Sequence, residues 1–71
     1  MTIDYAEANR LCRLHKGRLT RATKKGPEAV LVAVDAFYEA FDAAHLPLPD
    51  DWARWDRAAS DARFELARKD W

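Results

Sequence analysis

The sequence has little of the residue types that usually staple or interrupt a very small protein. A single cysteine, Cys12, excludes an intramolecular disulfide in the 71-residue chain. That cysteine and the two histidines, His15 and His45, do not form a zinc-binding pattern. Such a short chain buries only about 60% of its unfolded surface. Its stability must therefore come from a well-packed helical core or from self-association.

A hydrophobic run long enough to cross a bilayer is also missing, because the longest apolar stretch covers only residues 29–34. The hydrophobic fraction of 49%, with three Trp, three Phe and two Tyr, is nevertheless too high for a disordered chain. The lone cysteine fits a reducing compartment better than secretion. We therefore expect a globular cytoplasmic protein with no membrane partner.

Three amphipathic segments separated by two breaks predict helices at about residues 3–24, 27–44 and 50–69 of a single domain spanning 1–71. Thr2 or Asp4 can cap the first helix, and Asp4 with Glu7 has the spacing of a capping box. Residues 24–27 (KKGP) combine C-terminal cations, a glycine and a proline suited to the next first turn. The alternation of Leu and Pro at 46–49 predicts an extended connector.

The apolar residues of each segment recur at helical spacing and predict the core. The second segment is the most apolar and should lie at the centre of the molecule. Its apolar face consists of Val30, Val34, Phe37 and Phe41. The apolar face of the first segment consists of Ala8, Leu11, His15, Leu19 and Ala22, and that of the third consists of Trp52, Trp55, Ala59, Ala62 and Leu66. Three helices joined by short links predict an all-α antiparallel three-helix bundle.

The net charge of zero conceals a strong asymmetry along the chain. Residues 1–26 carry seven Lys and Arg against two acids, a net of +5, and residues 27–71 carry a net of −5. Most of the cations lie opposite the apolar stripe of the first helix. The cations that we predict to bind a partner are Arg10, Arg13, Lys16, Arg21 and Lys24.

Two other interpretations of this basic face stay open. Glu28, Asp35, Glu39 and Asp42 form an acidic stripe on the second helix, and the two faces could pair within the molecule. Alternatively, the cations could neutralise nucleic-acid phosphates. The neutral net charge, the isoelectric point of about 6.7 and the lack of interleaved aromatic residues argue against nucleic acid.

Some aromatic residues lie off the predicted core faces. Phe64 and Trp71 are candidate apolar anchors of an interface, and Tyr5 is expected to be exposed. The sequence contains neither a nucleophile paired with a base nor a glycine-rich phosphate loop, and a bundle this small has little room for a cleft. We therefore expect a protein that is not an enzyme and that needs no cofactor and no metal.

Parts of the sequence resemble small open-reading-frame products of actinobacterial phages and prophages, a group without an assigned function. The patterns are Tyr5 followed by Asn9-Arg10-Leu11, the run Leu19-Thr20-Arg21-Ala22, and Pro49-Asp50-Asp51-Trp52 followed by Arg54-Trp55 and Arg57-Ala58. The resemblance implies a small phage-encoded helical protein that binds a host protein or acts in phage regulation.

These observations favour a protein-interaction module, of the kind a phage uses to modulate a host protein, that binds through charged helix faces. A nucleic-acid-binding module using the same basic face is the first alternative. A small self-associating structural component is the second, and homodimerisation is compatible with each of them.

Overall fold

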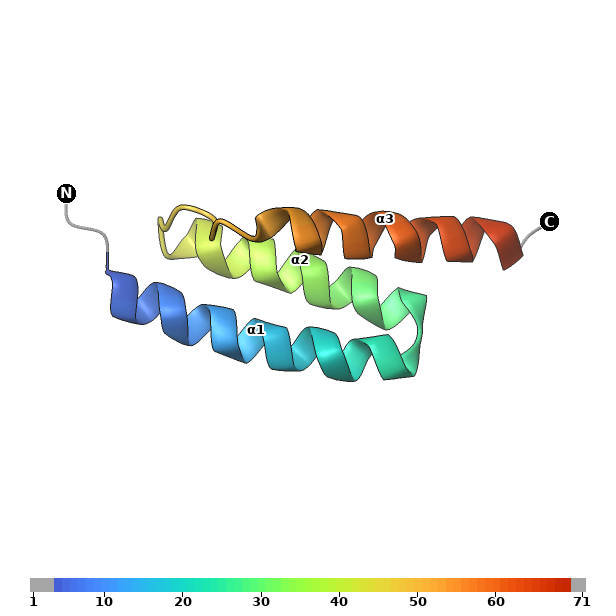
Figure 1. Cartoon of the computed structure of the whole chain (residues 1–71), viewed down its shortest axis with the longest axis horizontal. Helices are drawn as coiled ribbons and strands as arrows, with labels where there is room; N and C mark the ends of the chain where they lie inside the picture. Colours follow the sequence, from blue (N-terminus) through green and yellow to red (C-terminus); the bar gives the residue numbers. More distant parts are fainter. Residues whose placement is uncertain (1–3, 70–71) are drawn as a thin grey trace.

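The computed structural model describes residues 4–69 as three helices connected by two short links (Figure 1). Helix α1 spans Tyr5–Lys25, α2 spans Pro27–Ala43 and α3 spans Trp52–Lys69, with no strand among the described residues. Successive helices run in opposite directions, and both α1 and α3 pack against α2. The predicted all-α antiparallel three-helix bundle is confirmed, and each described helix boundary lies within two residues of its predicted position.

Helix α1 begins where an aspartate satisfies one of its free backbone N–H groups. Asp4 is extended, and its carboxylate accepts a hydrogen bond of 3.1 Å from the backbone N–H of Glu7. The side chain of Glu7 does not return to the Asp4 backbone; it accepts a hydrogen bond from the Arg10 guanidinium instead. The capping box that the spacing predicts is therefore only half formed.

The link between α1 and α2 is a single glycine. Gly26 has φ +131°, a backbone conformation that residues with a Cβ atom rarely adopt. Its N–H donates to the carbonyl of Ala22 at 3.1 Å, and its carbonyl accepts from Val30 at 3.2 Å. Pro27 follows in the first turn of α2, where its missing N–H costs no hydrogen bond. One residue is thus enough to reverse the chain.

Helix α2 ends in a Schellman arrangement formed by a residue other than glycine. His45 has φ +55°, its N–H donates to the Asp42 carbonyl at 3.1 Å, and the Leu46 N–H donates to the Phe41 carbonyl at 3.0 Å. Leu46 is half buried against the core, which is the apolar contact that usually accompanies this motif. The segment 46–49 then leads without regular structure to α3.

Aromatic side chains of α2 and α3 form the centre of the core. The rings of Phe37 and Trp55 stack with centroids 4.0 Å apart and an interplanar angle of 6°, and both side chains are fully buried. Phe41 lies 4.9 Å from Phe37, measured between centroids. Ala59 and Ala62 of α3 are buried in the same core cluster, where small side chains leave room for large rings.

The prediction that Trp52 belongs to the core is wrong, because 45% of this residue is exposed. Trp52 is the first residue of α3, whereas the buried residues of that helix begin one turn later at Trp55. Leu46, which folds back at the end of α2, packs against the core near Phe41. Trp52 therefore lies at the edge of the bundle.

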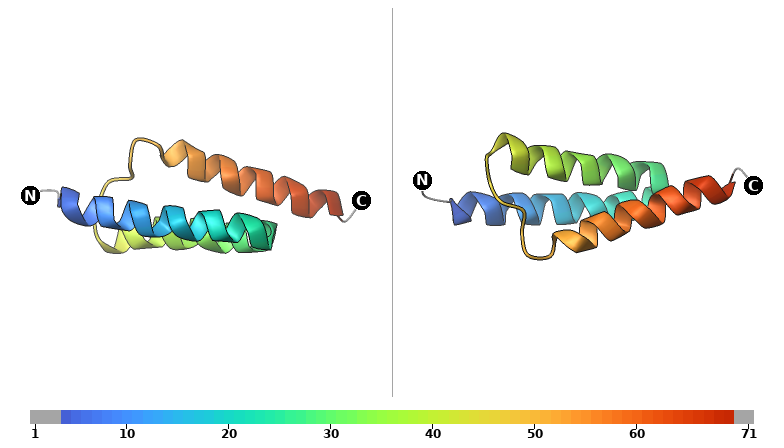
Figure 2. Two further views of the ribbon diagram at one scale, coloured as in Figure 1. Left: turned by 60° about the horizontal axis from the view of Figure 1, so that its bottom comes forward. Right: turned by 90° about the horizontal axis from the view of Figure 1, so that it is seen from above.

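The molecule is elongated, with principal extents of 49 × 18 × 18 Å. Figure 2 shows the C-terminal part of α3 extending past the link between α1 and α2. No Cα atom of α1 lies within 8 Å of a Cα atom of α3 in the described residues. Helix α2 is thus the only element that both other helices pack against closely.

Candidate interaction surfaces

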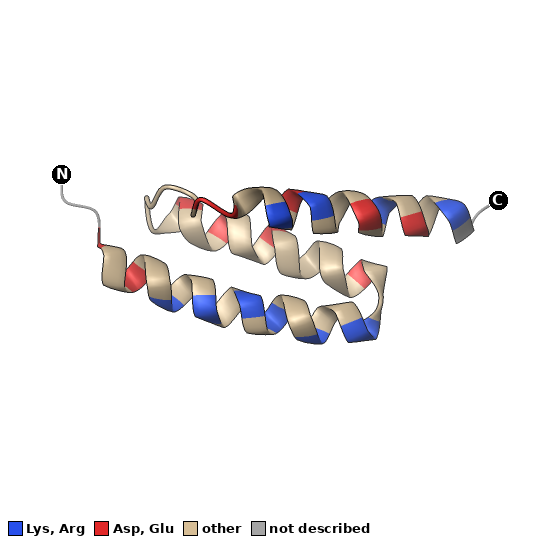
Figure 3. Cartoon of the chain, viewed as in Figure 1, with Lys and Arg blue, Asp and Glu red and all other residues tan. Residues whose placement is uncertain are grey.

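The cations of α1 form a continuous exposed face along the helix. All five residues of the predicted binding face are exposed, and so are Arg18 and Lys25. Figure 3 shows this basic face as a band that follows α1 along most of its length, while the acidic residues lie mainly on α2, α3 and the link before α3. We call Arg10, Arg13, Lys16, Arg21 and Lys24 the basic face.

The basic face is not neutralised by the acidic stripe of α2. In the described part of the chain, cations of the basic face form two ion pairs, Arg10 with Glu7 of the same helix and Lys16 with Asp51 at 3.3 Å. Both pairs are substantially exposed to solvent, where water and salt screen the attraction between the charges. The intramolecular pairing that the sequence left open is therefore absent between residues 4 and 69.

The ion pair within α1 changes the titration of both partners. The hydrogen bond and charge of the Arg10 guanidinium lower the pKa of Glu7, and the Glu7 carboxylate raises the pKa of Arg10 in turn. Arg10 is thus paired with a carboxylate of its own helix, and Lys16 is paired with Asp51. The cations of the basic face that remain without a carboxylate partner among the described residues are Arg13, Arg21 and Lys24.

The structure does not bring the predicted apolar anchors onto the basic face. Phe64 is 62% exposed, as expected, but it belongs to α3 and falls on the helix face opposite Trp55 and Ala62. Trp71 lies outside the described residues. Tyr5, at 71% exposure, is on α1 near the start of the helix. A partner that contacts both the basic face and Phe64 would have to reach around the bundle.

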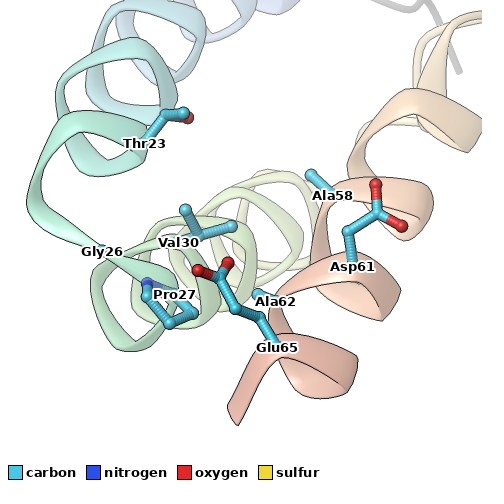
Figure 4. Close-up of a pocket in the computed structure, with 8 residues that line it drawn as sticks. All are labelled: Thr23, Gly26, Pro27, Val30, Ala58, Asp61, Ala62 and Glu65. Carbon is cyan, nitrogen blue, oxygen red and sulfur yellow. The ribbon is translucent and has the colours of Figure 1, made fainter. Parts of the chain in front are cut away.

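Open hollows border the helices, and three of them bear on the candidate surfaces. One of about 260 Å³ lies between the link that joins α1 to α2 and the helix α3, with Pro27 and Val30 on one side and Asp61 and Glu65 on the other (Figure 4). A second of about 470 Å³ lies between the start of α1 and the connector and includes the half-buried Cys12. Across the described residues, no three His, Cys, Asp or Glu side chains gather as a metal site would require.

The third hollow was not predicted from the sequence. It is a groove of about 460 Å³ between α1 and α2, with no α3 residue in its lining. Val32 lies on its rim and is 70% exposed. The signal was present in the sequence, because Val32 follows Glu28 by four residues and precedes Asp35 by three. Residues three and four apart share a helix face, so a valine between two acids at this spacing is expected to be exposed to solvent.

Two buried polar groups lie beside Phe37 at the centre of the core. His15 of α1 is 3% exposed and meets the Phe37 ring edge-on, with centroids 6.0 Å apart. Its Nδ1 atom, like Nε1 of Trp55, has no hydrogen-bond partner. Burial lowers the pKa of His15, and the nearby Arg18 cation lowers it further. His15 therefore acts as a neutral core residue.

No family model, no curated protein and no solved structure matches this chain. Among residues 4–69, no helix combines the length and the hydrophobicity needed to span a bilayer.

Proposed function

We propose that this protein is a small protein-interaction module that binds an acidic surface of another protein through the basic face of α1. The observation that carries the proposal is the exposure of Arg13, Arg21 and Lys24 without a carboxylate partner in the described structure. If these cations formed ion pairs with the acidic stripe of α2, they would only stabilise the fold. Cations that face solvent are free to meet charges from outside.

The geometry of the face suits an extended acidic partner. With a rise of about 1.5 Å per residue, the fourteen steps from Arg10 to Lys24 cover about 21 Å along a helix. A single exposed ion pair contributes only about 0–1 kcal/mol, so binding requires several pairs at once. Such a row contributes most to the rate of association and to orientation of the partner.

Nucleic acid fits this surface less well. Glu28, Asp35, Glu39 and Asp42 are all exposed on the adjacent helix and would repel phosphates near the basic face. No aromatic residue lies among the cations to stack on bases, as single-strand binders require.

The resemblance to actinobacterial phage products supports a more specific version of the proposal. In that version the partner is a cytoplasmic host protein whose activity the module alters, and Phe64 and Trp71 add apolar contacts. Because Phe64 lies on α3, it would contact a second region of the partner. Phe64→Ala should then weaken binding independently of the charge changes on α1.

The test is retention of a partner from an actinobacterial lysate on the immobilised protein, with and without nuclease. Arg13→Glu combined with Lys24→Glu reverses two unpaired cations of the basic face. Arg54→Glu combined with Arg57→Glu makes the same change of charge on exposed positions of α3 and serves as the matched control. We expect one protein in fixed stoichiometry, insensitive to nuclease, retained by the wild type and the control and lost with the α1 variant.

Two results would contradict the proposal. If all retained material disappears after nuclease treatment, and if affinity for a DNA duplex falls steeply between 50 and 200 mM salt, the basic face binds phosphates instead. If the α1 variant and the α3 control retain the same protein equally, the partner binds elsewhere on the molecule.

A further inference from the structure

The groove between α1 and α2 is an unpartnered apolar surface flanked by charge. Its floor is made of small side chains, and its α1 rim is basic. The floor residues are Ala22, Ala29, Ala33 and Ala36, and the α1 rim consists of Arg18, Arg21 and Lys25. Val32 stands on the α2 rim with 70% of its surface exposed. A groove of this kind is a place where another helix can pack closely.

The α2 side of the groove carries the opposite charge. Glu28 and Asp35 lie four residues before and three residues after Val32, so both neighbour it on the surface of the helix. Both are exposed, and neither forms an ion pair in the described structure. The groove is therefore bordered by a basic row on α1 and an acidic row on α2.

The two rows lie in register. Because α1 and α2 are antiparallel and joined by Gly26 alone, residues at equal distances from the link lie at similar heights along the hairpin (Figure 1). To within one residue, this places Lys25 level with Glu28, Arg21 level with Val32, and Arg18 level with Asp35. These heights follow from the number of residues between each position and Gly26, and from the equal rise per residue of the two helices.

This arrangement is complementary to itself. A two-fold axis parallel to the helices places α1 of one molecule over α2 of the other and preserves height along the hairpin. Arg21 of one copy then lies over Val32 of the other, between Glu28 and Asp35. A two-fold axis perpendicular to the helices would instead place α1 over α1 and oppose like charges. Charge thus selects one of the two symmetric pairings.

We propose that the groove between α1 and α2 binds a second copy of this chain, in a two-fold dimer that covers Val32. Two-fold symmetry repeats every contact, so each pairing of an α1 cation with an α2 carboxylate occurs twice in such an interface. The dimer also removes apolar surface from water, which a 71-residue chain with a small core benefits from. Arg21 belongs to both this groove and the basic face. The inference does not depend on the proposed partner, because Arg13 and Lys24, which the test of that partner reverses, do not line the groove.

The test measures the mass of the full chain by sedimentation equilibrium over a range of concentrations. We expect the wild type to reach twice its 8.2 kDa monomer mass. Arg21→Glu with Lys25→Glu makes both rows acidic, and Glu28→Lys with Asp35→Lys makes both rows basic. Each variant alone should weaken the dimer by about 100-fold or more, because like charges then oppose each other twice. An equimolar mixture of the two variants should restore a dimer.

The controls separate docking from folding. Arg54→Glu with Arg57→Glu changes the same number of charges on α3 and should leave the dimer intact. Val32→Glu should give a monomer with the helical circular dichroism of the wild type, because Val32 is mostly exposed, whereas Phe64→Glu should still dimerise. A wild type that stays at 8.2 kDa up to about 1 mM, or reversed variants that do not pair when mixed, would overturn the proposal.

Discussion

The two sides of α2 are built differently. Toward α3, the stacked rings of Phe37 and Trp55 form a closed aromatic contact with no exposed surface. Toward α1, the contact uses small residues and a histidine, and a groove remains open beside Val32. This protein therefore concentrates its aromatic packing on one side of its central helix and leaves the groove beside Val32 on the other.

Magnitudes support this division. A buried Trp or Phe removes about 150–250 Å² from water, which at about 25 cal/mol per Å² amounts to several kcal/mol per ring. An unpartnered buried polar atom costs about 1–3 kcal/mol. The α3 side has this cost at Nε1 of Trp55 but contributes a large buried ring, whereas α1 has the unpaired Nδ1 of His15 and contributes Leu11 and Ala22 to the buried core.

The largest expected effect is the loss of the aromatic contact. Trp55→Ala should destabilise the bundle by about 3–5 kcal/mol, since it removes the stacked ring and leaves a cavity beside Phe37. A domain of this length has about 4–10 kcal/mol of stability in total. Thermal and urea unfolding followed by circular dichroism should show a large drop in both midpoints relative to the wild type.

Trp52→Ala is the matched control, because it removes the same side chain from a site with 45% exposure. Its effect should remain below about 1 kcal/mol. If the two tryptophan variants lost equal free energies of unfolding, the packing of α3 on α2 would not depend on the Phe37–Trp55 stack.

Helix positions and the two links follow from the sequence because capping, glycine and proline act locally. Gly26 and Pro27 mark the first link, and Asp4 marks the start of α1. The choice between Trp52 and Trp55 depends on where α3 meets α2 in space, and helical spacing alone does not separate residues one turn apart. The edge position of Trp52 was for this reason beyond prediction.

The second prediction concerns pH and the α1 side. His15 has its pKa lowered by burial and by Arg18, so the unfolded chain binds its proton more readily than the folded chain does. Stability is then complete above the ordinary histidine pKa of about 6.5 and falls as the pH drops below it. We expect a loss of at most about 1.4 kcal/mol per pH unit between pH 6.5 and the lower folded-state pKa.

Urea unfolding at pH 7.5, 6.5 and 5.5 measures this dependence. His15→Leu should remove most of it and raise stability at all three values by about 1 kcal/mol, because the buried, unpaired Nδ1 of His15 is then gone. His45 is retained in this variant, so any dependence it contributes serves as the baseline. A variant with the same pH profile as the wild type would show that the weakness of the α1 side lies elsewhere.

The candidate surfaces were only partly predictable. The cations of α1 are exposed as expected, because residues opposite an apolar stripe face solvent. Whether they pair with α2 depends on the rotation of each helix about its axis, which a single helix pattern leaves undetermined. The exposure of Val32 could be expected from the acids beside it, but the groove depends on how α1 and α2 are rotated against each other and is defined only by the two helices together.

The smallest expected effect lies within α1 itself. Gly17 is exposed in the middle of the helix, and a Cβ atom added there would meet no atom within 4 Å. Gly17→Ala should therefore stabilise the protein by about 0.5–1 kcal/mol by restricting the unfolded chain. Gly26→Ala is the matched control with the opposite sign, because φ +131° strains a residue with a Cβ atom. Unfolding by urea should separate the two variants, and an unchanged midpoint for Gly17→Ala would show that helix propensity does not limit α1.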